Sequence, residues 1–396
     1  MLAVVILTAG VFSILTACSK IGAWDFIRQA ESHEGIGREI TLEIDLSGII
    51  WIDPGNGDSS DITDFPVLVR LDTSVDFDYP ERLSSDGSDI RFFDSSGHQL
   101  AYETALWNVS GPSAWWVRIP DLDKTLSNNT ITLSYDYWSE HPPIRLPEAD
   151  TWSNSFIGVW HLDEADGATT FRDSSIWGND GITGVDGMDV PVQELPPGSL
   201  GFGNARYFDS TGWANPSFRA PPPGDEGTEG ELEAYSLGYW ARFDAWGQMN
   251  FLEKGDIQLE YGGTGDFRSF VFRSGGNHRG DKSLDQWLSL ALVGEWIYFQ
   301  FTSSGILNNP PVASLRVYSN GDRKSGWTTN IKGGGDRNGN LGAPLQFCRQ
   351  SSDTAKFALD EIRLSRGERS QDWAILDYAN MSGVLNVTRV SEQVSQ

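Results

Sequence analysis

The amino-acid sequence predicts an all-β protein built from two tandem β-sandwich domains. At 396 residues the chain is long enough for two domains that each bury a core. Its 43 Gly, 18 Pro, 16 Trp, 11 Tyr and 20 Phe favour short strands and tight turns over long helices. Short runs with alternating apolar and polar residues recur between Gly-containing turns, as expected for half-buried strands.

The formal net charge of -26, from 29 basic and 55 acidic residues, argues against a nucleic-acid partner. Binding to nucleic acid depends largely on neutralising phosphates with Lys and Arg. Two explanations of the charge remain open. An acidic surface keeps an exported protein soluble, and clustered carboxylates also suit Ca²⁺, which prefers oxygen ligands.

Residues 1–17 are predicted to be a signal peptide, because the apolar run from Leu2 to Ala17 is short for a membrane span. It ends in Leu15-Thr16-Ala17-Cys18, which resembles a bacterial lipobox. The resemblance implies a lipid on Cys18, anchorage in the cell envelope and, with Ser19 in the next position, the outer membrane. A buried helix is the alternative, and no Lys or Arg precedes the run. Acylation of Cys18 would leave Cys348 without a disulfide partner.

Residues 18–38 are interpreted as a tether, and alternation begins at Glu39, where the first domain, 39–138, is predicted to start. Turns such as Asp86-Gly87 separate its strands. The predicted strands are Ile40 to Leu46, Val67 to Leu71, Ile90 to Phe93, Trp115 to Ile119 and Asn128 to Tyr137.

Residues 139–152 contain adjacent prolines and are predicted to be a linker, because such backbone stays extended and unpaired. The second domain, 153–394, shows no convincing amphipathic helix longer than a few turns and no fixed repeat. Its predicted strands are Phe156 to Leu162, Ala205 to Asp209, Ser236 to Phe243, Asn250 to Glu253, Phe267 to Arg273, Trp296 to Thr302, Ser314 to Ser319 and Phe357 to Ser365.

The second domain resembles the laminin-G-like domains of the concanavalin A-like lectin/glucanase superfamily. The motifs that carry the resemblance occur in the family's order. They are Val159-Trp-His-Leu-Asp-Glu, Gly178-Asn-Asp-Gly, Ser236-Leu-Gly-Tyr-Trp, Leu315-Arg-Val-Tyr-Ser-Asn-Gly and Leu359-Asp-Glu-Ile-Arg-Leu-Ser. The resemblance covers about 240 residues and implies a concanavalin A-like jelly roll.

The first domain resembles the family called domain of unknown function 2341. The matching segments are Phe65-Pro-Val-Leu-Val-Arg-Leu, Asp86-Gly-Ser-Asp-Ile-Arg-Phe-Phe-Asp, Tyr102-Glu-Thr-Ala-Leu-Trp and Trp115-Trp-Val-Arg-Ile-Pro. Such domains commonly precede a laminin-G-like domain in bacterial surface proteins, so the two resemblances support each other. Neither family name specifies a ligand.

No catalytic residue is assigned. Glycoside hydrolases of the superfamily use a Glu-x-Asp-x-x-Glu strand motif, and the nearest segment, which begins at Glu43, lacks the final Glu and lies in the other domain. Asp360 and Glu361 are adjacent, so a regular strand would point them to opposite faces. The five histidines are scattered in the predicted tether, turns and strands; a lone His in a turn is usually a solvated side chain, and none of the five is expected to have a catalytic role. They are His33, His98, His141, His161 and His278.

Calcium is the cofactor that the laminin-G-like resemblance suggests. Related jelly rolls often hold one structural Ca²⁺ between the opening loop and the closing strand. Carried over to this chain, the metal ligands would be Asp360 and Asp173, with Asp163 or Asp180 from the same loop. The alternative is that these residues form turns without a metal, as Asp and Asn before Gly commonly do.

Sugar binding requires exposed aromatic faces. Trp213, Trp246 and Trp327 are the candidates, because each lies close to Gly in a predicted loop, although such residues can also plug a loop. Trp160, Trp240 and Trp296 lie in predicted strands and are assigned to cores. The sequence thus predicts a non-catalytic lipoprotein that recognises a glycan or an envelope or extracellular protein. A structural envelope component and a divergent glycoside hydrolase remain alternatives.

Overall fold

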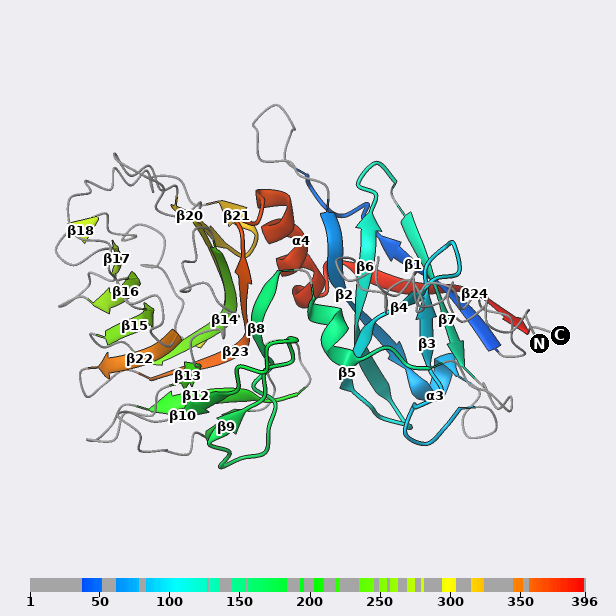
Figure 1. Ribbon diagram of the computed structural model, residues 1–396, viewed down its shortest axis with the longest axis horizontal. Coiled ribbons are helices and arrows are strands. Elements are labelled where there is room, and N and C mark those ends of the chain that lie inside the picture. Colours follow the sequence, from blue (N-terminus) through cyan, green and yellow to red (C-terminus); the bar gives the residue numbers. More distant parts are fainter. Residues whose placement is uncertain are drawn as a thin grey trace, which may run out of the picture.

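The computed structural model (Figure 1) is an all-β protein in which antiparallel sheets pack as sandwiches. No helix of the described residues is long and apolar enough to cross a membrane. The structure describes residues 38–51, 62–77, 83–126, 128–135, 144–153, 155–183, 193–195, 203–209, 218–220, 235–245, 249–254, 257–262, 269–274, 279–280, 294–303, 315–323, 345–351 and 356–394.

The first module contains a five-stranded sheet in the order β24-β1-β7-β3-β4 and a three-stranded sheet in the order β2-β6-β5. Its elements before the junction are β1 (Arg38–Asp45), β2 (Ile62–Asp72), α3 (Thr73–Asp76), β3 (Arg91–Phe93), β4 (Gln99–Leu100), β5 (Tyr102–Leu106), β6 (Pro112–Leu122) and β7 (Asn128–Tyr135).

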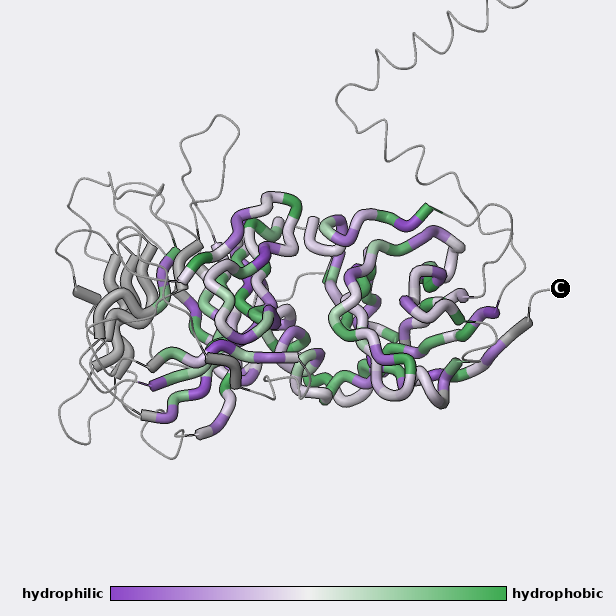
Figure 2. The backbone as a smooth tube through the Cα atoms, turned by 90° about the horizontal axis from the view of Figure 1, so that it is seen from below, coloured by the Kyte–Doolittle hydropathy of each residue, from purple (hydrophilic) through white to green (hydrophobic). Residues whose placement is uncertain are grey.

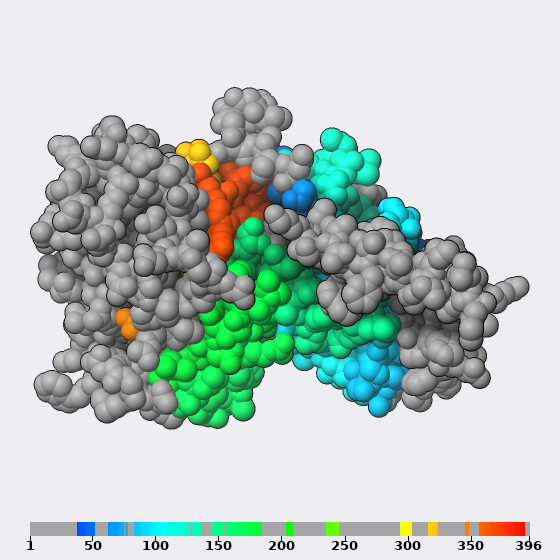
Figure 3. Space-filling view, in the orientation of Figure 1, coloured from blue at the N-terminus to red at the C-terminus, as the bar shows by residue number. Residues whose placement is uncertain are grey.

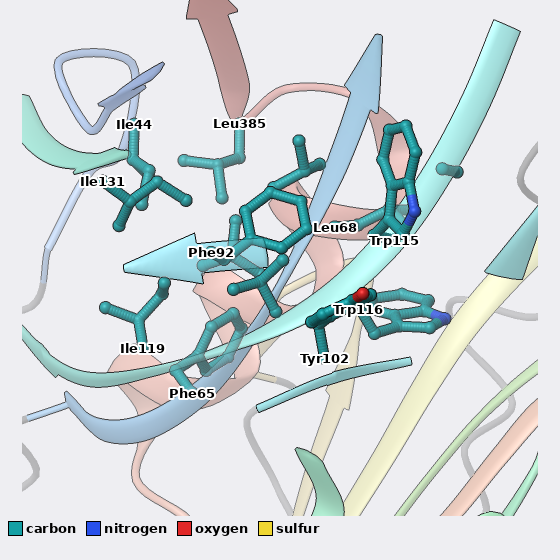
Figure 4. Packing of buried hydrophobic residues seen from close by; sticks show 14 of the residues in the cluster. Ile44, Phe65, Leu68, Phe92, Tyr102, Trp115, Trp116, Ile119, Ile131 and Leu385 are labelled. Atoms are coloured by element: carbon teal, nitrogen blue, oxygen red, sulfur yellow. The ribbon is translucent and has the colours of Figure 1, made fainter. Parts of the chain in front are cut away.

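The alternation seen in the sequence directs the apolar side chains of this module inward. Ile40, Leu42 and Ile44 of β1 are completely buried, as their period-two spacing predicts. Apolar and hydrophilic residues alternate along the described strands (Figure 2). In the core itself (Figure 4), Ile44 lies close to Ile131 and to Leu385, which comes from the far end of the chain.

The last strand, β24 (Asn386–Val394), belongs to the first module, because it pairs antiparallel with β1 along that strand's whole length. The sequence analysis placed these residues in the second domain, whose predicted end was residue 394. No strand was predicted at these residues, and local patterning says nothing about which strands pair, so only the fold assigns β24 to the sheet of β1.

The second module contains two large sheets, in the orders β18-β17-β16-β15-β22-β13-β10-β9 and β11-β12-β23-β14-β19-β20-β21, and β8 also pairs with β23. Its strands are β8 (Phe156–Trp160), β9 (Thr170–Phe171), β10 (Gly181–Thr183), β11 (Gln193–Leu195), β12 (Ala205–Asp209), β13 (Phe218–Ala220), β14 (Tyr235–Ala245), β15 (Met249–Lys254), β16 (Ile257–Gly262), β17 (Ser269–Ser274), β18 (Arg279–Gly280), β19 (Trp296–Ser303), β20 (Leu315–Ser319), β21 (Asp322–Arg323), β22 (Leu345–Ser351) and β23 (Lys356–Arg366).

These two sheets enclose a core rich in aromatic rings. Tyr239 of β14 packs edge-on against Phe347 of β22, with ring centroids 5.3 Å apart, so the core joins the two sheets. Trp160 and Trp240 are buried, as predicted, and Trp296 is half-buried. The two tryptophans face different ways, because Trp160 belongs to this core and Trp240 belongs to the core shared with the first module.

The modules meet through the 3-10 helix η2 (Glu148–Trp152) and helix α4 (Gln371–Ser382). The segment 139–152 was predicted to be an extended linker, but among its described residues Thr151 and Trp152 are completely buried. The core of the first module continues through α4 to the outer face of β14 and β19, where it includes Trp240 and Tyr298. In Figure 3, α4 (orange-red) lies between the two modules.

Helix α4 begins at Ser370, whose side chain accepts a hydrogen bond from the Trp373 amide, and ends at Gly383 in the left-handed region. Its buried residues include the polar side chains Asp372, Asp377 and Asn380 among apolar ones, which explains why the sequence shows no amphipathic period. The Asn380 side chain accepts from Leu68 N at 2.8 Å and donates to Pro66 O at 2.9 Å. It thereby covers the free edge of β2 in place of another strand.

Candidate functional site

Asp173, one of the four predicted calcium ligands, organises the loop after β8. Its carboxylate accepts hydrogen bonds from the amides of Val159 (2.8 Å), Ser175 (2.9 Å) and Asn179 (2.7 Å) and from the Ser175 hydroxyl (2.7 Å). These four bonds use the lone pairs that a metal would need. In this structure Asp173 therefore acts as a loop organiser, which corresponds to the turn-forming alternative.

The other three predicted ligands differ in how exposed they are and in the contacts they make. Asp360 is buried in β23, Asp163 is exposed, and exposed Asp180 accepts a hydrogen bond from the Asp173 amide at 2.9 Å. Among the described residues, no group of three or more His, Cys, Asp or Glu side chains is arranged to hold a metal ion. Calcium binding stays a prediction from the resemblance. Cys18, Trp213, Trp246 and Trp327 lie outside the described residues.

The densest group of buried charges lies where the two modules meet. It is a continuous chain of side chains with alternating charge, which we call the junction chain. From the first module through the second to α4, its members are Glu103, His161, Glu361, Arg363, Asp377 and Tyr298. None of the six was assigned a role from the sequence.

A bulge in β23 positions Glu361. The register with β14 jumps from Gly238 opposite Arg363 to Trp240 opposite Asp360, and Glu361 adopts a φ of 50°. A non-glycine residue in this region costs about 1 to 2 kcal/mol. Leu359 and Ile362 both face the inter-sheet core, so two residues lie between successive inward side chains. The predicted opposite orientation of Asp360 and Glu361 assumed a regular strand, which the bulge interrupts.

His161 joins the modules, because its two ring nitrogens lie near carboxylates of different modules. Nδ1 is 2.9 Å from Glu361 Oε1 on β23, and Nε2 is 3.2 Å from Glu103 Oε2 on β5. A doubly protonated imidazole can donate to both. Only 13% of the His161 side chain is exposed. His98, which lies in a turn, is 57% exposed, as expected of a lone His in a turn.

Glu103 is held by three further groups besides His161. The Trp152 indole donates to Oε2 at 2.5 Å, and the Ser174 hydroxyl donates to Oε1 at 2.7 Å. Arg172 Nη1 lies 4.0 Å from Oε1. The carboxylate of β5 is therefore bound by η2 and by the loop after β8, so three separate segments converge on one side chain.

Arg363 connects β23 to α4. Its Nη2 donates to Glu361 Oε2 at 2.8 Å, and its Nη1 donates to Asp377 Oδ1 at 2.9 Å. The guanidinium also lies over the Trp116 ring of β6, 4.3 Å from the centroid, and 5.1 Å from that of Trp152. A planar cation with bidentate donors and stacking faces suits this position better than Lys would.

Tyr298 ends the junction chain by donating from its hydroxyl to Asp377 Oδ2 at 2.5 Å. Gly238 on β14 lies close to this hydroxyl, because a Cβ added there would lie 2.3 Å from the Tyr298 hydroxyl oxygen. Gly238 pairs with Gln300 on β19, and Tyr298 lies two residues before Gln300, on the same face of that strand.

Burial and pairing act against each other on the pKa values of these groups. Burial alone would lower the pKa of His161, but the Glu361 and Glu103 carboxylates hold it well above its usual value, which favours the protonated ring. Burial raises the pKa of Glu103, and the His161 charge with three hydrogen bonds outweighs it, so the net shift is downward. Burial raises the pKa of Asp377 despite Arg363.

The arrangement fixes the modules to each other and leaves little access for a substrate. The side chains of Glu103 and Glu361 are each 6% exposed, and the same imidazole lies between them. A glycosidase needs two carboxyl groups that flank an accessible sugar bond. A buried set of paired charges instead specifies one relative orientation, since any other arrangement would leave a charge buried without its partner.

Comparisons with known proteins support the first-module resemblance and leave the ligand open. Residues 86–141 match the family model described as Domain of unknown function (DUF2341). No curated protein matches the chain.

Among solved structures, one similar chain is the binding domain of Botulinum neurotoxin DC in complex with rat synaptotagmin II. It has 14% identity, a TM-score of 0.42, and coverage of 57% of this chain and 52% of that chain. The same binding domain with SialylT has 15% identity, a TM-score of 0.44 and the same coverage. The binding domain of Paraclostridial Mosquitocidal Protein 1 has 11% identity and a TM-score of 0.39, again covering 57% and 52%. This chain thus covers about half of each, and similarity this low carries no argument about ligand.

Proposed function

We propose that this protein is a non-catalytic recognition protein of the bacterial cell envelope, anchored by a lipid on Cys18, which binds a glycan or a protein through its second, laminin-G-like module. The observation that carries the proposal is that the two sheets of that module have different surroundings. One sheet is used for attachment to the first module, and the other faces away from it (Figure 1).

The attachment sheet contains β14, β19 and β23, whose outward side chains at the junction are buried. Trp240, Tyr298 and Arg363 all point to the junction, where they contact α4 or the first module. A face buried in this way is not accessible to a ligand. The eight-stranded sheet that contains β15, β16 and β17 lies at the end of the molecule farthest from the first module (Figure 1).

The junction itself supports recognition rather than hinge-like closure. The modules share one apolar core, and the junction chain crosses from β5 through β23 to α4. Domains that move relative to each other usually have small, polar interfaces. We infer that the first module presents the second in a fixed orientation at a distance from the membrane, with residues 18–38 as the tether.

The test is a glycan-array screen of the chain from Ser19 onward, run in calcium and in EGTA, with protein shown to be folded by circular dichroism. Binding to one class of polysaccharide supports recognition of sugars, and loss of binding in EGTA would support calcium at Asp360 and Asp173. Trp213→Ala, Trp246→Ala and Trp327→Ala then locate the aromatic platform. A folded protein that binds nothing on the array would favour the alternative, a structural envelope component.

The lipid anchor has a separate test. Cells that express the full chain are labelled with tritiated palmitate, and Cys18→Ser is compared with the wild type. Incorporation that depends on Cys18 supports the anchor, whereas equal labelling of the two chains would contradict it. Fractionation of inner and outer membranes then tests the outer-membrane location.

A further inference from the structure

The C-terminal strand β24 is held differently from the other long strands. It occupies the edge of its sheet and pairs only with β1. Its described side chains, from Asn386 to Glu392, are half-buried or exposed, and Val390 is 56% exposed. Since β24 buries little apolar area, the hydrophobic effect contributes little to its attachment.

The contacts that attach β24 by side chains are few and lie near the surface. Glu392 pairs with Arg38 at 3.2 Å and accepts from the Tyr135 hydroxyl at 3.1 Å. Arg389 pairs with Glu392 and donates to Asp76 O at 2.8 Å. Exposed or half-exposed ion pairs of this kind are weak. The backbone ladder to β1 therefore supplies most of the attachment, and edge ladders open more readily than central ones.

The segment between α4 and β24 ends in an anchor, Leu385, so a departing strand would have to turn at Asn386. Gly383 ends α4 with a φ of 79°, Val384 is 48% exposed, and Leu385 is buried in the core with its amide bonded to Ala379 O at 2.9 Å. The helix stays fixed through Asn380 and Leu385 when the strand leaves, so β24 can detach without disturbing the junction chain.

We propose that β24 is an exchangeable strand, and that its alternative acceptor is β1 of a second copy of this chain. A detached β24 exposes two unpaired edges, its own and that of β1. Two such molecules can pair reciprocally and re-form the contacts that β24 makes within one chain, including the Arg38–Glu392 ion pair. The contacts made are the same in both states, which is the condition that makes strand exchange inexpensive.

The second copy is the favoured occupant because the pairing of β24 with β1 places no like charges opposite each other. Glu43 faces Thr388 and Asp45 faces Asn386, so no like charges oppose each other, and Ile44 faces Val387 on the core side. An unrelated strand would have to reproduce this pattern as well as the shift between Thr41 and Leu42. This inference does not depend on the proposed ligand recognition.

The experiment uses cross-strand cysteines in the full chain, purified in detergent. The background carries Cys18→Ser and Cys348→Ser, which removes both native thiols. Glu43→Cys and Thr388→Cys are made in separate chains, mixed, concentrated and oxidised, because directly opposed strand residues meet the geometry of a disulfide. A disulfide-linked dimer is expected, and its yield should rise with protein concentration.

The matched control mixes Glu39→Cys with Asn386→Cys, which lie at opposite ends of the same ladder and cannot meet in this register. Its dimer yield should be at least tenfold lower. A chain that carries both Glu43→Cys and Thr388→Cys should form the internal disulfide when dilute, which verifies the strand pairing. Absence of the mixed dimer, with the internal disulfide present, would show that β24 does not exchange. Equal dimer yields in test and control would indicate random collision and would equally overturn the proposal.

Discussion

Two strands that are close in sequence, β23 and β24, differ sharply in how the fold uses them. β23 lies inside its sheet and has nine buried residues of eleven, whereas β24 lies at an edge and none of its described side chains is buried. Only helix α4 separates them. A strand's contribution to stability therefore depends on which elements cover it, rather than on its β-forming sequence.

The largest expected effect follows from breaking the junction chain at β23. Arg363→Met removes the shared partner of Glu361 and Asp377, which would leave two buried carboxylates underpaired. We expect a loss of about 3 to 5 kcal/mol in unfolding free energy, measured by urea denaturation. The control is Arg316→Met in β20 of the same sheet, whose pair with Glu368 is partly exposed and whose loss should cost about 1 kcal/mol or less. Similar losses for the two variants would contradict the assigned role of Arg363.

Glu103→Gln tests the contact of the junction chain with the first module. We expect a loss of about 1.5 to 3 kcal/mol at pH 7, because a charge-assisted contact to His161 is weakened. The folded-state pKa of Glu103 is lowered, with burial outweighed by His161, so its stabilisation is present above the unfolded pKa and is lost as pH falls through the folded pKa. The difference in unfolding free energy between wild type and variant, measured by urea denaturation, should therefore become smaller below about pH 4. A gap independent of pH would refute this.

Gly238→Ala tests the close approach of β14 to Tyr298. The added methyl group would meet the Tyr298 hydroxyl, and we expect a loss of about 1 to 3 kcal/mol from overpacking. In a Tyr298→Phe background the same Gly238→Ala substitution should cost less than in the wild type, because the colliding oxygen is gone. Gly48→Ala is the control, since no atom lies within 4 Å of the new Cβ. Equal melting temperatures for all three chains would argue against a steric role for Gly238.

The smallest effect is expected at β24. Glu392→Gln weakens the contacts with Arg38 and Arg389, and we expect about 0.2 to 1 kcal/mol of lost stability, which salt should mask. Thermal melts at low and high ionic strength measure it. A loss comparable to that of Arg363→Met would mean that β24 is as strongly attached as β23, and would remove the contrast between the two strands.

Local patterns in the sequence were sufficient to predict the all-β class and most of the strands. Alternation is a local property, so it identified β1 through Ile40 and Leu42 and identified β12 at its observed bounds, 205–209. The same local information assigned Trp160 and Trp240 to cores. It could not distinguish which core each residue enters, because that depends on which face of the sheet another element covers.

Which side chains and strands contact each other depends on the tertiary structure. The junction chain joins Glu103, His161 and Glu361, which are separated by 58 and 200 residues in the sequence, and no spacing rule links them. The bulge at Glu361 and the return of β24 to β1 are likewise choices of register and neighbour. Local patterning specifies which residues seek burial, whereas the packing of distant segments specifies which charges meet when they are buried.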